Sequence, residues 1–105
     1  MATEVMKDRF SREFRLTDER KSHILKHPEM KGQLEKIKET LADPDFIQRS
    51  KNDHNTLLFY KLYKKTPVGE KHLVAAAKLL NYQSFIITAF FTDNVRKGKS
   101  IWLKI

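Results

Sequence analysis

Cysteine is absent from this chain of 105 residues. Disulfides and thiolate metal ligands are therefore excluded, and the cytoplasm is the expected location. Long hydrophobic runs are absent as well, because LVAAAKLL is interrupted by Lys78 and FIITAFF is only as long as a strand. Neither approaches the roughly 18 apolar residues that span a bilayer. The N-terminal MATEVMKDRF has no apolar signal segment, so we expect an unexported protein without a membrane partner.

Positive charge is in excess. The chain has 21 Lys and Arg against 13 Asp and Glu, a formal net charge of +8, which favours polyanionic partners and nucleic acid first. Solubility alone is the simpler explanation of the same charge. Hydrophobic residues make up 40% and charged residues 32%, which predicts one folded domain over residues 1–105. No pattern in the chain indicates an oligomeric state.

Apolar spacing and capping residues predict the N-terminal elements. An even spacing over 9–16 indicates a short edge strand, and it is formed by Phe10, Phe14 and Leu16. Thr17 is a suitable N-cap and two carboxylates follow it, so we expect a helix from Thr17 to His27. Pro28 cannot continue this helix without strain but suits the first position of another helix. The HPE sequence is therefore predicted to form a corner between two helices.

A second helix follows the corner. Its apolar residues recur at intervals of four, three and four and form one stripe, made of Met30, Leu34, Ile37 and Leu41. The ADPD sequence ends the helix, because Pro44 lacks an amide hydrogen and aspartates favour turns.

Short strands fill the rest of the chain. Breaker sequences separate strands predicted at 46–49, 57–64, 72–79 and 85–92, with a last short strand at 101–103. The connections are too short for parallel crossovers, so we expect an antiparallel meander. The predicted fold class is α+β: an N-terminal strand and two helices packed on one face of an antiparallel sheet, with the other face partly open.

Several stretches together resemble a known family. RLTDERKSHILKHPEM is followed by IKETLADPDFIQRS, the aromatic strand LLFYKLY, HLVAAAKL, FIITAFFT and KGKSIW. The series, over roughly residues 10 to 103, is similar to the phage-type branch of the BECR nucleases (barnase, EndoU, colicin E5/D and RelE). The resemblance implies a barnase/RelE-like fold and a metal-independent ribonuclease, often a toxin, with its active site on the open sheet face. It also implies a cognate antitoxin or immunity protein as a partner.

Two departures from the family pattern stand out. The hairpin strand reads VAAAK where larger β-branched residues are expected, and Phe90 occupies a position where tyrosine is usual. The missing hydroxyl matters if a phenol takes part in the chemistry and matters little if the ring only packs.

RNA cleavage without a metal requires a base, an acid and groups that stabilise charge on phosphorus. His23 and His27 lie four residues apart on one predicted helix face and are candidates for both proton transfers. Arg20, three residues before His23, would share that face and hold phosphate through its planar guanidinium. The simpler alternative for His27 is a structural role at the HPE turn.

The sheet offers three more candidates. Strict alternation along 85–92 turns Phe85, Ile87, Ala89 and Phe91 toward the helices. Thr88 then faces the open side, where the resemblance implies a hydroxyl that contacts phosphate; an ordinary strand threonine is the alternative. Lys78 interrupts an apolar strand and is a candidate for stabilising transition-state charge, or only a lysine that reaches solvent. Tyr60 is a candidate for stacking on a base, although strand aromatics more often belong to the core.

Zinc is the main alternative to metal-free chemistry. His-x-x-x-His on a helix supplies two ligands, as in HExxH proteases, but Ile24 occupies the place of the glutamate. A third ligand would have to come from His54 or His72 in other segments. We therefore expect neither a metal nor another cofactor.

The sequence thus predicts a cytoplasmic, phage-related ribonuclease. His23, His27, Lys78 and Thr88 are its expected catalytic residues, and attack by the 2′-OH would leave a 2′,3′-cyclic phosphate. The alternative is a non-catalytic RNA-binding or phage/toxin-assembly protein of the same fold.

Overall fold

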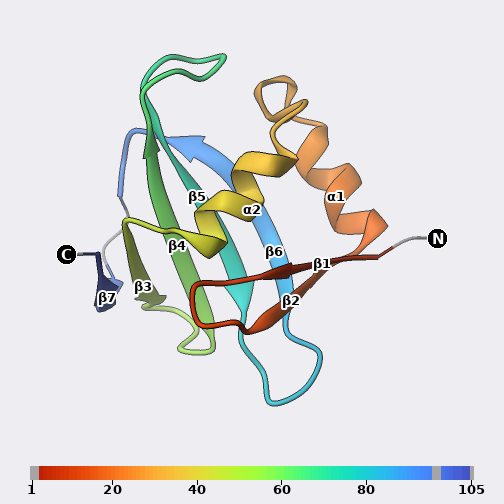
Figure 1. Cartoon of the computed structure of the whole chain (residues 1–105), viewed down its shortest axis with the longest axis vertical. Coiled ribbons are helices and arrows are strands. Elements are labelled where there is room, and N and C mark those ends of the chain that lie inside the picture. The colour runs from red at the N-terminus through yellow and green to blue at the C-terminus, as the bar shows by residue number, and fades with distance from the viewer. Residues whose placement is uncertain (1–2, 96–97, 105) are drawn as a thin grey trace.

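A computed structural model describes residues 3–95 and 98–104 of the chain (Figure 1). The elements are β1 (Glu4–Lys7), β2 (Glu13–Leu16), α1 (Asp18–Leu25), the 3₁₀ turn η1 (Pro28–Met30), α2 (Leu34–Ala42), β3 (Phe46–Ser50), β4 (Thr56–Tyr63), β5 (Lys71–Lys78), β6 (Phe85–Thr92) and β7 (Gly98–Leu103). The fold is α+β, as the sequence predicts. Within the described ranges, no helix is long and apolar enough to cross a membrane.

The prediction of a single N-terminal strand was wrong. The structure has two short antiparallel strands, β1 and β2, where the sequence predicted one over 9–16. Asp8 causes the difference, because its carboxylate accepts hydrogen bonds from the amides of Phe10 (3.0 Å) and Arg12 (2.8 Å) and so closes a tight turn. Phe10 belongs to this turn, and its ring packs edge-on against Trp102 of β7.

The predicted helix start and corner are confirmed. The Thr17 hydroxyl accepts a hydrogen bond from the Arg20 amide at 3.2 Å, so Thr17 caps α1. The helix ends at Leu25, two residues before the predicted end, and Pro28 occupies the first position of η1. α2 begins only at Leu34, because the chain turns through Gly32, whose φ is +74°.

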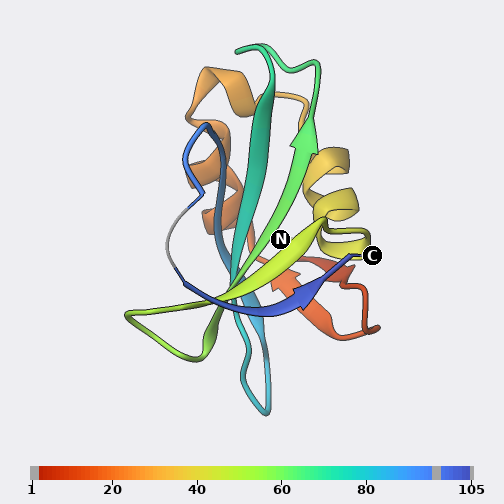
Figure 2. The same cartoon turned by 90° about the vertical axis from the view of Figure 1, so that its left-hand side faces the viewer.

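The sheet has seven strands in the order β1-β2-β6-β5-β4-β3-β7. Strands β3 to β6 form the predicted antiparallel meander, and β7 pairs antiparallel with β3. One parallel bridge, Arg15 to Phe85, joins β2 to β6 and makes the sheet mixed, which the sequence did not predict. Figure 2 shows β7 at the edge of the sheet beside β3, with its C-terminal end on the side where α2 lies.

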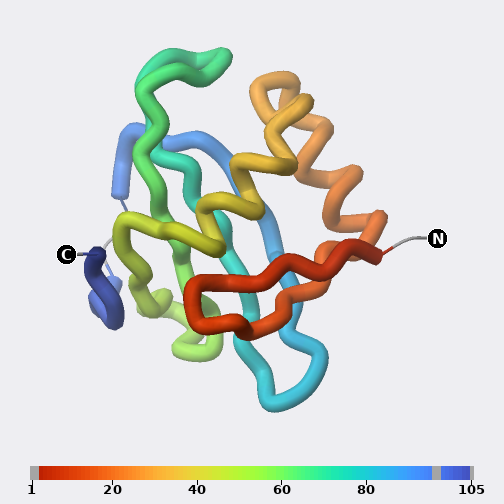
Figure 3. The backbone as a smooth tube through the Cα atoms, viewed as in Figure 1, coloured from red at the N-terminus to blue at the C-terminus, as the bar shows by residue number. Residues whose placement is uncertain are grey.

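The main core lies between strands β3 to β6 and a layer made of both helices and the β1–β2 hairpin, which joins the sheet only at β6. Figure 3 shows the hairpin crossing the lower part of the sheet below α2. Helix residues Ile24, Met30, Ile37 and Leu41 are fully buried here against Phe59, Leu73 and other strand residues. Three of the four residues of the predicted α2 stripe are fully buried, and Leu34 packs at the margin.

A smaller apolar cluster occupies the other sheet face. It contains Leu58, Tyr60, Val74 and Ala76, with Phe46, Ile87 and Phe90 packed against it. The register between β5 and β6 shifts from Ala76↔Thr88 to Ala77↔Ile86, which inserts Ile87 as a bulge. Ile86 therefore faces the helices and Ile87 faces away from them, opposite to the strict alternation predicted from the sequence.

Candidate active site

The two candidate histidines lie at the exposed side of the helical layer. Ile24 turns into the core, whereas His23 is exposed on α1 and His27 is exposed just beyond it. His27 precedes η1, but its side chain makes no capping hydrogen bond, so the imidazole is not used to hold the HPE corner. The structural role considered for His27 is therefore filled by its backbone, whose carbonyl accepts a hydrogen bond from the Met30 amide at 2.9 Å.

Arg20 lies on the same side of α1, one turn before His23. Its amide bonds the Thr17 cap, while its guanidinium makes no hydrogen bond or ion pair within the part of the chain described. We call Arg20, His23 and His27 the α1 ridge. Arg20 and His23 are three residues apart within α1 and are neighbours on one helix surface. His27 lies beyond the end of α1 in an extended conformation, so the helical spacing of four residues predicted for the two histidines does not apply. The ridge combines a permanent cation with two imidazoles, the side chain that most often transfers protons in catalysis.

Lys78 ends β5 on the sheet face opposite the helices. Its ammonium makes an ion pair with Asp53 of the β3–β4 loop, and Asp53 also accepts hydrogen bonds from the Asn55 amide (3.0 Å) and the Thr56 hydroxyl (3.1 Å). The Lys78 hydrogen bond, followed by the Asn55 hydrogen bond, holds the pKa of Asp53 below its ordinary value. At neutral pH the carboxylate is charged, so Lys78 has a fixed anionic partner.

Asp53 was not among the candidates predicted from the sequence, where it belongs to the breaker KNDHN. The signal was present, because an Asp two residues before Asn55 is typical of a turn in which the carboxylate binds the backbone. Its contact with Lys78, 25 residues later, depends on the pairing of β4 with β5 and could not be found locally.

Thr88 has the orientation that was predicted. It pairs with Ala76 of the outer cluster, so it faces away from the helices, and it is partly exposed. Among the described residues its hydroxyl has no hydrogen-bond partner, whereas the Thr92 hydroxyl of the same strand bonds the backbone of Asn94. Thr88 and Lys78 thus lie on one face of adjacent strands.

Tyr60 does not present its ring to solvent. The side chain is fully buried, stacks on Phe46 with the ring centroids 4.8 Å apart, and meets the edge of His72 at 6.3 Å. A base cannot stack on this ring in the folded structure, so the stacking role predicted for Tyr60 needs correction. Tyr60 lies on the sheet face away from the helices, where it belongs to a buried apolar cluster.

The candidate residues form two groups and not one constellation. The α1 ridge belongs to the helical layer, while Lys78 and Thr88 lie on the opposite side of the sheet. Within residues 3–95 and 98–104, no hydrogen bond or ion pair joins the two groups. In the same ranges, no cluster of three or more His, Asp or Glu side chains is arranged to hold a metal ion.

The geometry defines a compact α+β protein with a cationic, histidine-bearing helix ridge. No family model, curated protein or solved structure matches the chain.

Proposed function

We propose that this protein is a metal-independent endoribonuclease of the BECR type, with a barnase/RelE-like fold, acting in the cytoplasm. The observation that carries the proposal is the α1 ridge. It supplies one cation suited to phosphate and two exposed histidines whose side chains make no hydrogen bond or ion pair with the residues that the structure describes. The sequence resemblance, the net charge of +8 and the packing of both helices on one sheet face give further support.

In the proposed reaction one histidine removes the proton from the ribose 2′-OH, whose oxygen attacks the adjacent phosphorus. The other histidine protonates the departing 5′-oxygen, leaving a 2′,3′-cyclic phosphate and a 5′-OH end. Arg20 holds the non-bridging oxygens as their negative charge increases. Thr88 and Lys78 contribute if the RNA strand passes the edge of β6 and reaches the opposite sheet face.

Toxin activity and neutralisation by an antitoxin or immunity protein are part of this proposal through the resemblance alone. An acidic partner would complement the positive charge of the chain.

A second candidate function is RNA binding without cleavage, as a phage- or toxin-associated protein of the same fold. Two observations favour it. Lys78 is already paired with Asp53, and the histidines lie on the other side of the sheet from Thr88. Binding needs only a basic surface, whereas catalysis needs its groups around one phosphate.

The decisive experiment incubates purified protein with total RNA in excess EDTA and maps the new 3′ ends. Ribonuclease activity predicts cyclic-phosphate ends. His23→Ala and His27→Ala should each slow their formation by about 10²- to 10⁴-fold, while His54→Ala, an exposed histidine outside the ridge, should act like wild type. The cleavage rate of Thr88→Ala measures how much the Thr88 hydroxyl on the sheet contributes to the reaction. No cleavage by a wild-type protein that still binds RNA would select the second candidate.

A further inference from the structure

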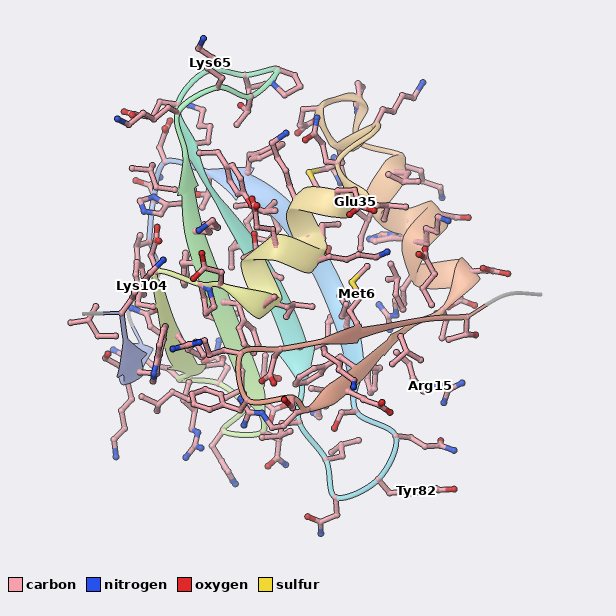
Figure 4. The ribbon with its side chains drawn as sticks, in the orientation of Figure 1. Met6, Arg15, Glu35, Lys65, Tyr82 and Lys104 are labelled. Carbon is pink, nitrogen blue, oxygen red and sulfur yellow. The ribbon has the colours of Figure 1, made fainter. Side chains whose placement is uncertain are left out.

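A groove of about 580 Å³ lies between the outer face of the β1–β2 hairpin and the β5–β6 loop. None of the residues predicted from the sequence to be functional lines it. Val5, Leu79 and Leu80 contribute apolar surface, and Arg15 and Tyr82 contribute larger side chains. Figure 4 labels Arg15 and Tyr82 at this lower corner of the molecule, beside the loop.

Tyr82 is the most conspicuous residue of the groove. It is 79% exposed, the largest fraction among the exposed large hydrophobic residues, so its ring contributes little to folding. The ring is nevertheless held out by an ordered loop. The Ser84 hydroxyl accepts a hydrogen bond from the Leu80 amide (2.9 Å) and donates one to the Leu80 carbonyl (3.1 Å), while Gln83 has a φ of +58°. A fixed loop that exposes an aromatic ring is suited to stacking on a flat ligand.

Arg15 gives the groove its charge. The residue lies on β2 between Val5 of β1 and Phe85 of β6, and its amide donates a hydrogen bond to the Ser84 carbonyl at 2.9 Å. The Arg15 guanidinium makes no hydrogen bond or ion pair with any residue that the structure describes. Arg15 therefore brings to the groove a planar cation without a partner among the described residues, and its backbone is joined to the loop that bears Tyr82.

Two other charged residues line the groove. Arg12 is bound to the buried carboxylate of Asp8, through Nε at 2.7 Å and a terminal nitrogen at 2.6 Å, so much of its charge is compensated. Glu13 is exposed on the outer face, and its negative charge would repel an anion bound near it. The arrangement favours a ligand whose anionic group meets Arg15 while a flat, uncharged part stacks on Tyr82.

We propose that this groove binds single-stranded RNA, with a phosphate on Arg15 and an unpaired base stacked on Tyr82. Asn81 and Gln83 also line the groove, and their side-chain amides would hydrogen-bond to base edges. The inference rests on RNA as the ligand of the proposed function, but it does not depend on cleavage. The groove would act as a positioning subsite that selects unpaired over duplex RNA, because a base within a helix cannot stack on the ring.

The test measures binding of a fluorescein-labelled 2′-O-methyl decaribonucleotide by anisotropy at several salt concentrations. The probe has no free 2′-OH, so a failure of the ribonuclease proposal does not affect the result. Tyr82→Ala should weaken binding by about tenfold, and Tyr82→Phe should bind like wild type because stacking needs only the ring. Arg15→Gln should weaken binding and reduce the slope of log K against log salt by about one.

Lys65→Gln is the matched control, because it removes one charge from the β4–β5 loop at the opposite end of the molecule (Figure 4). Near-ultraviolet circular dichroism verifies that each variant is folded. Wild-type binding by both Tyr82→Ala and Arg15→Gln would overturn the proposal. So would an equal loss in Lys65→Gln, which would indicate diffuse attraction to a basic surface. Equal affinity for a duplex of the same sequence would overturn the selection of single strands.

Discussion

Substitution of Asp8 should destabilise the protein more than substitution of any other carboxylate we consider. Its side chain is completely buried, and it accepts four hydrogen bonds or ion-pair contacts from the turn that it closes. The turn connects β1 to β2 and positions Phe10 against Trp102. Loss of the carboxylate therefore removes the local reason for the hairpin and loosens the contact between the turn and β7.

The size of the effect follows from these contacts. A hydrogen bond from an amide to a carboxylate contributes about 1.5–3 kcal/mol, and Asp8 accepts two, from Phe10 and Arg12. The ion pair with Arg12, whose side chain is 32% exposed, adds less than about 1 kcal/mol. Asp8→Ala should cost about 4 kcal/mol. Asp8→Asn retains an oxygen acceptor and should cost about 1–2 kcal/mol.

Urea unfolding followed by circular dichroism measures both variants. At a slope of about 1–2 kcal/mol per molar, Asp8→Ala should lower the midpoint by roughly 2–4 M. Asp93→Ala is the control, because Asp93 is an exposed carboxylate paired with Lys71 and its loss should change stability by less than about 1 kcal/mol. If Asp8→Ala were no more destabilising than Asp93→Ala, the turn would not depend on Asp8. Equal losses in the Ala and Asn variants would indicate that charge, not hydrogen bonding, is the cause.

Three further predictions concern other parts of the fold. Ile24→Ala removes the only fully buried side chain of α1 and should cost about 2–5 kcal/mol in urea unfolding, with loss of α1 helicity. Hydrogen bonds from Lys104 and then Lys61 lower the pKa of Asp43 from 3.8, so its stabilisation is present above that pH and is lost as the pH falls through the lower folded value. Acid unfolding curves should accordingly be less steep for Asp43→Asn than for wild type, and parallel curves would contradict the assignment. Gly98→Ala would place a Cβ 2.8 Å from a backbone carbonyl oxygen of β3 and should destabilise the β3–β7 pair by about 1–3 kcal/mol, seen as faster amide exchange there.

The sequence determined the local elements of this protein. Thr17, Pro28 and the ADPD turn act within a few residues of themselves, so the helix start, the corner and the end of α2 were predictable. The strands β3 to β6 were also predicted within a residue or two, because breakers separate their apolar runs. Short connections left the antiparallel meander as the only simple arrangement. The shared surface of Arg20 and His23 on α1 follows from helix spacing in the same way, whereas His27 lies beyond the end of the helix.

The tertiary structure decided whatever depends on contacts between distant segments. The Ile87 bulge exchanged the faces of two adjacent isoleucines, an effect of pairing with β5 that no period in β6 reveals. Tyr60 became buried because Phe46 stacks on it from a neighbouring strand, and Lys78 acquired Asp53 across the β4–β5 pair. The groove beside Tyr82 exists only because β2 bridges β6 at Arg15. Residue types and short spacings determine local geometry, whereas the position of a side chain in a site depends on strand register and packing, which the whole chain sets together.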